Sequence, residues 1–124
     1  TAVRICPAGW HLPTRAEWRI LFDAVGGEGY AGYLLKSASG WNNNGSSSGN
    51  GRDAFYFSAK PAGDRDIDSY GAHYNALGGS AYFWTSTEDY NYNAYYIQFH
   101  YQDNDVYDDS IYKDFAVSVR CVQD

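Results

Sequence analysis

The two cysteines, near opposite ends of the chain, restrict its possible folds more than any other feature. Cys6 and Cys121 are the only cysteines among the 124 residues, and neither belongs to a CxxC pair of the kind that binds zinc. Three interpretations are open: a reactive thiol, two reduced thiols in a core, or one disulfide. We favour the disulfide, because the termini of a single domain often lie close together. It would add about 4–5 kcal/mol of stability on the chain-entropy account and would indicate an oxidising, extracytoplasmic setting.

Length and composition indicate one folded domain over residues 1–124. Hydrophobic residues make up 44% of the chain, which is too many for wholesale disorder. No apolar run approaches the roughly 18 residues of a membrane span, so we expect a soluble form with no direct membrane insertion. The stretch after Thr1 lacks the apolar core of a signal peptide, so we expect any targeting segment to lie outside this sequence. The net charge of −6 disfavours nucleic acid as a partner.

Two helices are predicted in the first third of the chain. Thr14-Arg15-Ala16-Glu17 is a capping-box pattern, and apolar residues follow at helical spacing until Gly26-Gly27. This predicts a helix over about residues 14–25. A second, shorter helix is expected over residues 29–37, although Gly32 weakens it.

Strands are predicted in the later part of the chain, where apolar and polar residues alternate. Between these segments the sequence predicts a long surface loop over residues 39–53 and an irregular segment that runs to Gly79. Early helices and late strands indicate an α+β fold with an antiparallel sheet. The predicted strands are Phe55–Ala59, Tyr82–Thr87, Tyr95–Gln102 and Phe115–Cys121.

The C-terminal third has an unusual composition. Residues 89–124 contain 7 acidic and 2 basic residues, a net charge of −5, so they carry nearly all of the chain's excess charge. Between Asp89 and Tyr112 there is no Lys, Arg or Glu, and Tyr, Asp and Asn predominate. Antibody binding loops use a similar mixture, because tyrosine gives rigid contact area and short polar side chains give adaptable hydrogen bonds.

We interpret the outward-facing residues of this segment as a ligand-binding surface. The plain alternative is that the tyrosines are ordinary sheet residues whose hydroxyls reach water, and this is expected of Tyr95 and Tyr101 on the apolar face. The candidate ligand-binding residues are Tyr90, Tyr92, Asn93, Tyr96, Gln98, His100, Gln102, Asp103, Asn104, Asp105, Tyr107, Asp108, Asp109, Ser110 and Tyr112.

Catalytic and metal sites have little support in the sequence. The stretch Gly45–Gly49 matches GxSxG but lacks the flanking strand and helix of a nucleophile elbow. The three histidines form no HxxxH or HExxH pair. We therefore predict no catalytic residue, no metal site and no cofactor. A loose calcium site stays open as an alternative, in one of two acidic groups. These groups are Asp64, Asp66 and Asp68, or Asp103, Asp105, Asp108 and Asp109.

Several motifs together resemble the Fibrobacter succinogenes major paralogous domain family. The first runs from Cys6 to Thr14, with Glu17-Trp18 following, and the others recur in the same order and spacing along nearly the whole chain. The resemblance implies a C-type lectin-like fold, with two helices packed on a twisted antiparallel sheet, long loops and neighbouring termini. It adds weight to the disulfide and implies a bacterial surface or secreted protein. The later motifs are Phe57–Gly63, Phe83–Glu88 and Ser118–Val122.

Three further expectations follow from the resemblance. The sugar-binding motifs of calcium-dependent lectins and the active-site cysteine pair of formylglycine-generating enzymes are missing from this sequence. Residues 89–114 are similar to the diversified segments of retroelement variable proteins, in bacteria or phage, because they are rich in residues reachable from Asn codons by adenine changes. The leading hypothesis is thus a non-enzymatic receptor or adhesin-type domain, extracellular or at the cell surface, that binds a protein ligand. The alternatives are a carbohydrate-binding module and a structural module of a larger surface protein.

Overall fold

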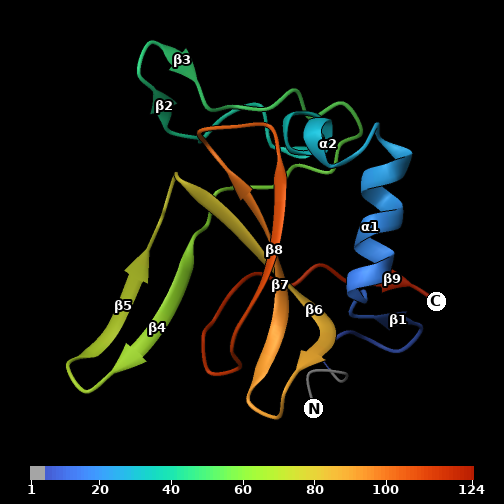
Figure 1. Ribbon diagram of the computed structural model, residues 1–124, viewed down its shortest axis with the longest axis vertical. Helices are drawn as coiled ribbons and strands as arrows, with labels where there is room; N and C mark the ends of the chain where they lie inside the picture. The colour runs from blue at the N-terminus through green and yellow to red at the C-terminus, as the bar shows by residue number, and fades with distance from the viewer. Residues whose placement is uncertain (1–4) are drawn as a thin grey trace.

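The computed structural model describes residues 5–124 and has an α+β architecture, as predicted (Figure 1). Two helices follow a short first strand, and the strands form small antiparallel sheets rather than one large sheet. No helix in this part of the chain is both long and apolar enough to cross a bilayer. The elements are β1 (Trp10–His11), α1 (Arg15–Ala24), α2 (Glu28–Leu35), β2 (Asn43–Asn44), β3 (Ser47–Ser48), β4 (Asp64–Asp68), β5 (Gly71–Asn75), β6 (Ser80–Asp89), β7 (Asn93–His100), β8 (Val106–Tyr112) and β9 (Val122–Gln123).

A three-stranded antiparallel sheet, in the order β6-β7-β8, forms the centre of the molecule. Phe83 of β6 pairs with Ile97 of β7, and Phe99 pairs with Val106 of β8. These four side chains are buried and belong to one hydrophobic core. The predicted strands at Tyr82–Thr87 and Tyr95–Gln102 correspond to β6 and β7.

Helix α1 covers one face of this sheet (Figure 1). Its N-terminus has the predicted capping box, in which the Thr14 hydroxyl accepts from the Glu17 N–H and the Glu17 carboxylate accepts from the Thr14 N–H. Trp18 packs against Phe83 with ring centroids 5.5 Å apart, and Phe22 packs edge-on against Phe99. The apolar stripe seen in the sequence is therefore the stripe that meets the sheet.

Helix α2 lies across the end of the central sheet at the β7–β8 turn. The Gly32 N–H donates to the Asn104 carbonyl at 3.0 Å, and a Cβ at Gly32 would lie 2.5 Å from that oxygen. Gly32 lowers the helix propensity of α2, but only a residue without a side chain allows α2 to approach the Asn104 backbone this closely.

Two predictions for the middle of the chain are wrong: the strand at Phe55–Ala59 and the irregular segment that runs to Gly79. Phe55–Ala59 is not a strand, because Tyr56 and Ser58 have φ values of 57° and 55°, and the Asp53 carboxylate binds the Ser58 N–H and hydroxyl instead. The segment expected to be irregular up to Gly79 contains the β4–β5 hairpin. The loop over residues 39–53 holds the short, exposed β2–β3 hairpin.

The last third also differs from the prediction. Residues 115–121 form isolated bridges at Ala116 and Ser118 rather than a strand, and a two-residue strand, β9, follows. Strand β8 was not predicted, because Asp108, Asp109 and Ser110 interrupt its apolar alternation. The segment around Ala116 runs between β6 and β4: the Trp84 N–H donates to Ser118, and the Arg65 N–H donates to Ala116.

The two ends of the described chain are joined, as the cysteines predicted. Cys6 and Cys121 form a disulfide with their Cα atoms 5.8 Å apart. Strands β1 and β9 pair beside it. His11 lies between two carboxylates, with Nε2 2.8 Å from Glu17 and Nδ1 2.7 Å from Asp124. These carboxylates raise the pKa of His11, Glu17 having the larger effect.

Candidate ligand-binding surface

The central sheet has an inner face toward α1 and an outer face on the opposite side. Phe83, Phe99 and Asp108 contact side chains of α1 and so mark the inner face. Because strand side chains alternate, their neighbours Tyr82, Gln98 and Tyr107 point the other way. We define the outer face by Tyr82 of β6, Tyr96, Gln98 and His100 of β7, and Tyr107, Asp109 and Ile111 of β8.

The fifteen candidate residues fall into four places on the structure. Five lie on the outer face, four in the β7–β8 turn, four at the opposite end of the sheet and two on the inner face. In that order they are Tyr96, Gln98, His100, Tyr107 and Asp109; Gln102, Asp103, Asn104 and Asp105; Tyr90, Tyr92, Asn93 and Tyr112; and Asp108 and Ser110.

The two inner-face candidates are engaged within the fold. Asp108 forms ion pairs with Arg15 and, at 3.4 Å, with Arg19, both on α1. The hydrogen bond from Arg15 is the main reason why the pKa of Asp108 is lowered. Ser110 donates to Asp89 on β6. Both side chains therefore serve the fold and do not belong to the outer face.

Tyrosine and glutamine side chains interlock on the outer face. Tyr82 and Tyr96 pack edge to face with ring centroids 5.4 Å apart. The Gln98 amide donates to the Ser80 hydroxyl at 3.1 Å and to the Tyr82 hydroxyl at 3.3 Å. These contacts fix the rings in place, so they present contact area with little rotamer entropy left to lose on binding.

A small pocket opens where the outer face meets strand β4. It has a volume of about 160 Å³. Burial raises the pKa of Tyr96, and the nearby Asp109 and Asp64 carboxylates raise it further. The pocket therefore combines an aromatic wall with a local excess of negative charge. Its lining residues are Asp64, Tyr82, Tyr96, Ile111, Phe115 and Val117.

The β7–β8 turn is held from both sides. The Tyr107 hydroxyl donates to the Asp103 carboxylate at 2.5 Å, and this bond is the main cause that raises the pKa of Tyr107 to about 12. Below the turn, the Lys36 ammonium is buried and donates to the carbonyls of Gly49, His100 and Asp103 at 2.9–3.2 Å. Burial lowers the pKa of Lys36. These hydrogen bonds fix the position of the acidic β7–β8 turn.

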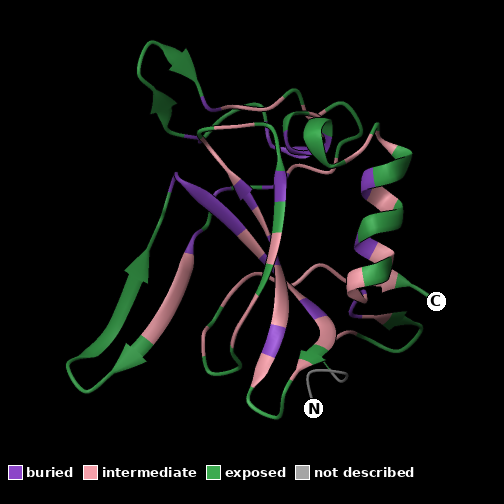
Figure 2. Ribbon diagram, in the orientation of Figure 1, coloured by how far each residue is buried: buried purple, intermediate pink, exposed green. Residues whose placement is uncertain are grey.

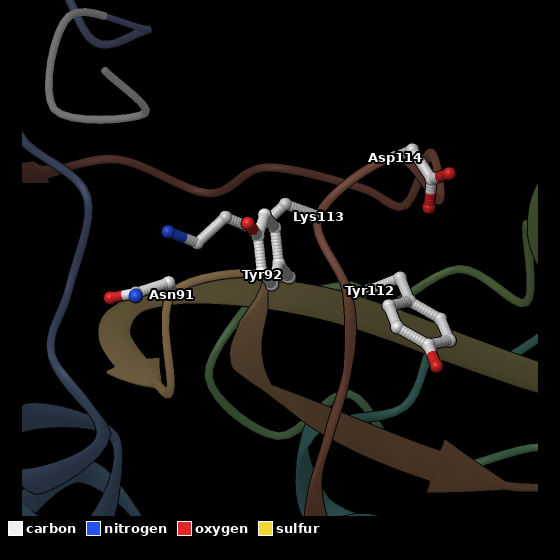
Figure 3. A pocket seen from close by; sticks show the side chains of 5 residues that line it. All are labelled: Asn91, Tyr92, Tyr112, Lys113 and Asp114. Atoms are coloured by element: carbon white, nitrogen blue, oxygen red, sulfur yellow. The ribbon is translucent and has the colours of Figure 1, made fainter.

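A wider, open pocket lies at the opposite end of the sheet, between the β6–β7 turn and the end of β8 with the two residues that follow it. It has a volume of about 410 Å³. Tyr92 and Tyr112 are exposed by 77% and 62%, and Figure 3 shows them projecting from the two neighbouring segments. The Lys113 N–H donates to the Tyr92 carbonyl at 2.8 Å, which joins those segments. The lining residues are Asn91, Tyr92, Tyr112, Lys113 and Asp114.

Sequence reasoning missed several residues of these two pockets. Tyr82 could have been found, because alternation along β6 places it opposite the buried Phe83. Asp64, Phe115 and Val117 had no such signal, because only the tertiary crossing of residues 115–118 between β4 and β6 brings them to the outer face. Outside the pockets, the role of Lys36 in supporting the β7–β8 turn gave no signal either, because an isolated lysine is ordinarily exposed.

Metal and nucleophile candidates stay apart in the structure. Within residues 5–124, no three side chains of His, Cys, Asp or Glu lie close enough together to hold a metal ion. The GxSxG match lies in the exposed β2–β3 hairpin, where no buried strand precedes Ser47.

The fold and this surface define a class of protein: a small, disulfide-linked α+β domain with a tyrosine- and aspartate-rich sheet face. The Fibrobacter succinogenes major domain (Fib_succ_major) matches residues 1–123, nearly the whole chain. The protein therefore belongs to this family, which confirms the resemblance of its motifs. Neither a curated protein nor a solved structure matches the chain.

Proposed function

We propose that this protein is a non-enzymatic ligand-binding domain, displayed outside the cytoplasm, that binds a protein ligand through the outer face of its central sheet. The observation that carries the proposal is the placement of Tyr96, Gln98, Tyr107 and Asp109 together on the sheet face opposite α1. Fixed aromatic rings among short polar groups favour protein recognition. The β7–β8 turn, with Asp103 and Asp105, extends this surface at one end of the sheet.

The charge of this surface favours a basic partner. Asp103, Asp105 and Asp109 form no ion pair within residues 5–124. Unpaired surface carboxylates accelerate encounter with a cationic protein and disfavour an anionic one. The partner is therefore expected to present Lys or Arg side chains to the outer face.

The rest of the molecule suits the role of a frame. The Lys36 hydrogen bonds and the close packing at Gly32 hold the β7–β8 turn, and the disulfide joins the two ends of the chain away from the outer face. A fixed frame with a separate contact surface supports the hypothesis that residues 89–114 are diversified by a retroelement. The joined termini, the two helices and the central antiparallel sheet support a C-type lectin-like fold.

Carbohydrate binding is the second candidate, and it rests on a different observation. The open pocket of Tyr92 and Tyr112 combines exposed aromatic rings with the polar groups of Asn91 and Asp114. Aromatic rings that cover an apolar sugar face, beside hydrogen-bonding groups, are a usual arrangement in ligand sites.

Two matched double variants separate these candidates. Binding is measured on a protein array and a glycan array for Tyr96→Ala/Tyr107→Ala, for Tyr92→Ala/Tyr112→Ala and for wild type. We expect the wild type to bind a protein on the array. We expect Tyr96→Ala/Tyr107→Ala to lower that affinity by about 30-fold or more, which is the size of a hot-spot loss. The control is Tyr30→Ala/Tyr33→Ala, which changes two exposed tyrosines of α2. Glycan binding lost only in the Tyr92/Tyr112 variant would support the second candidate instead.

A further inference from the structure

The residues that line the small pocket beside Asp64 indicate which chemical group can bind there. Five of its six lining residues give it an apolar or aromatic wall, and the sixth, Asp64, supplies a carboxylate. At about 160 Å³ it has room for the end of one side chain rather than for a folded segment. Its occupant is therefore a narrow group that is apolar along its length and polar at its tip.

The carboxylates around the pocket indicate that the polar end of the bound group is positively charged. Asp64 forms no ion pair with any basic side chain of residues 5–124. Its carboxylate accepts a long hydrogen bond of 3.3 Å from the Asn75 amide. Asp109 stands directly opposite Tyr96 in the β7–β8 pairing and also has no ion pair there. Two carboxylates near one phenol ring repel an anion and attract a cation.

The walls suit a long cationic side chain. Ile111, Phe115 and Val117 are half-buried and can cover the alkyl stem of a lysine or arginine. Tyr82 and Tyr96 pack against each other at 76° and both line the pocket, so a cation in the pocket can lie against aromatic rings. A planar guanidinium fits best, because it can stack on a ring while its N–H groups bind the carboxylate.

We propose that this pocket binds the guanidinium end of an arginine side chain presented by the protein partner. The inference rests on the proposed function and deepens it, because it names the partner group that the outer face recognises. Arginine binds with its stem against Ile111 and Val117, its plane against Tyr96 and its N–H groups toward Asp64. The protein partner is thus held at one defined point as well as by general charge attraction.

The test uses a small probe, so that it does not depend on finding the partner. Acetyl-Gly-Arg-Gly-amide is titrated into the whole domain, and the NMR signals of the tyrosine rings and backbone amides are followed. The matched probe is acetyl-Gly-citrulline-Gly-amide, which keeps the shape of the side chain and removes its charge. We expect saturable shifts at Tyr82, Tyr96 and Ile111 with the arginine peptide, at a millimolar Kd, and binding at least about tenfold weaker for citrulline.

Two variants with equal net charge separate a local effect from a general one. Asp64→Asn is expected to weaken arginine binding by about tenfold, whereas Asp23→Asn, at an exposed position of α1 away from the outer face, leaves it unchanged. Unperturbed backbone amide shifts in each free variant establish that the fold is retained. Equal binding of citrulline, equal loss in both variants, shifts away from the pocket or no shift at all would each overturn the inference. A protein ligand on the array that still needs Tyr96 and Tyr107 would leave the proposed function standing in any of those cases.

Discussion

At the scale of single residues, Lys36 shows how one side chain can organise three segments. Its ammonium is 2% exposed and joins the Gly49 loop, the end of β7 and the β7–β8 turn through their backbone carbonyls. Hydrogen bonds from a charged donor are stronger than neutral ones, and buried carbonyls are costly to leave without a donor. The ring of Trp41, 5.1 Å from the ammonium, adds a cation–π contact.

Replacing this lysine tests its structural role. Lys36→Met keeps the length of the side chain and removes its three donors, so the free energy of unfolding is expected to fall by about 3 kcal/mol. Lys60→Met, which changes an exposed lysine, is the control and is expected to alter stability by less than about 0.5 kcal/mol. Urea denaturation measures both. Equal stability of the two variants would contradict the role given to Lys36.

His11 makes stability depend on pH in a defined direction. Glu17 and Asp124 raise its pKa above the ordinary 6.5, so the folded protein binds this proton more tightly than the unfolded chain does. The stabilisation is therefore fully present below pH 6.5 and is lost as the pH rises through the raised pKa. Urea denaturation from pH 6 to 9 should show falling stability in the wild type and a flatter profile in His11→Gln. Identical slopes would show that His11 is not the titrating group.

At the level of helices and strands, sequence patterns correctly predicted α1 and β7, whose apolar periodicity lies within the element itself. The capping box at Thr14 and the helical stripe through Trp18 identified α1 to within one or two residues. The alternation around Ile97 identified β7, which contributes to the core on one face. Both elements carry their own periodicity, so no knowledge of their neighbours was needed.

The elements that sequence reasoning missed depend on tertiary pairing. Strand β8 places Asp108 against α1, where Arg15 offsets the charge of the carboxylate. The inner face of β8 therefore lacks the apolar alternation that would have predicted a strand. Strand β4 carries Asp64, Asp66 and Asp68 on one face, and Figure 2 shows its partner β5 exposed along its length. Hairpins of this kind have little core-facing alternation. The candidate site was predicted as a set of residues, but its division among four places needed the strand register.

The contact between α2 and the β7–β8 turn gives a prediction at this scale. Gly32→Ala places a Cβ 2.5 Å from the Asn104 carbonyl oxygen, so the turn must move or the helix must shift. We expect a loss of about 1–3 kcal/mol in the free energy of unfolding, as overpacking usually costs. Gly29→Ala is the matched control on the same helix, because its nearest atom, an Asp105 carboxylate oxygen, would lie at 3.7 Å. It is expected to be neutral or stabilising, since alanine favours helix. A neutral Gly32→Ala would contradict the tight contact.

At the scale of the whole molecule, the disulfide closes a loop of almost the entire chain. Cys6 and Cys121 are 115 residues apart in sequence. A crosslink over such a loop reduces the entropy of the unfolded chain strongly. This is the large-scale counterpart of the local supports at Lys36 and Gly32.

Removing the crosslink should therefore weaken the whole domain rather than one part of it. Cys6→Ala/Cys121→Ala is expected to lower the free energy of unfolding by about 4 kcal/mol, and reduction of the wild type should have a similar effect. Thermal and urea denaturation under oxidising and reducing conditions measure this. A change below about 1 kcal/mol would show that pairing of β1 with β9 is enough to hold the ends together.

Mapping where a bound protein contacts the domain decides whether the outer face is the recognition surface. The measurement is the set of backbone amide and tyrosine ring NMR shifts of the domain when a protein ligand from the array is added. We expect perturbations concentrated at Tyr82, Tyr96, Gln98, Tyr107 and Asp109. Perturbations concentrated on α1 or the β2–β3 hairpin, with the outer face unchanged, would contradict it.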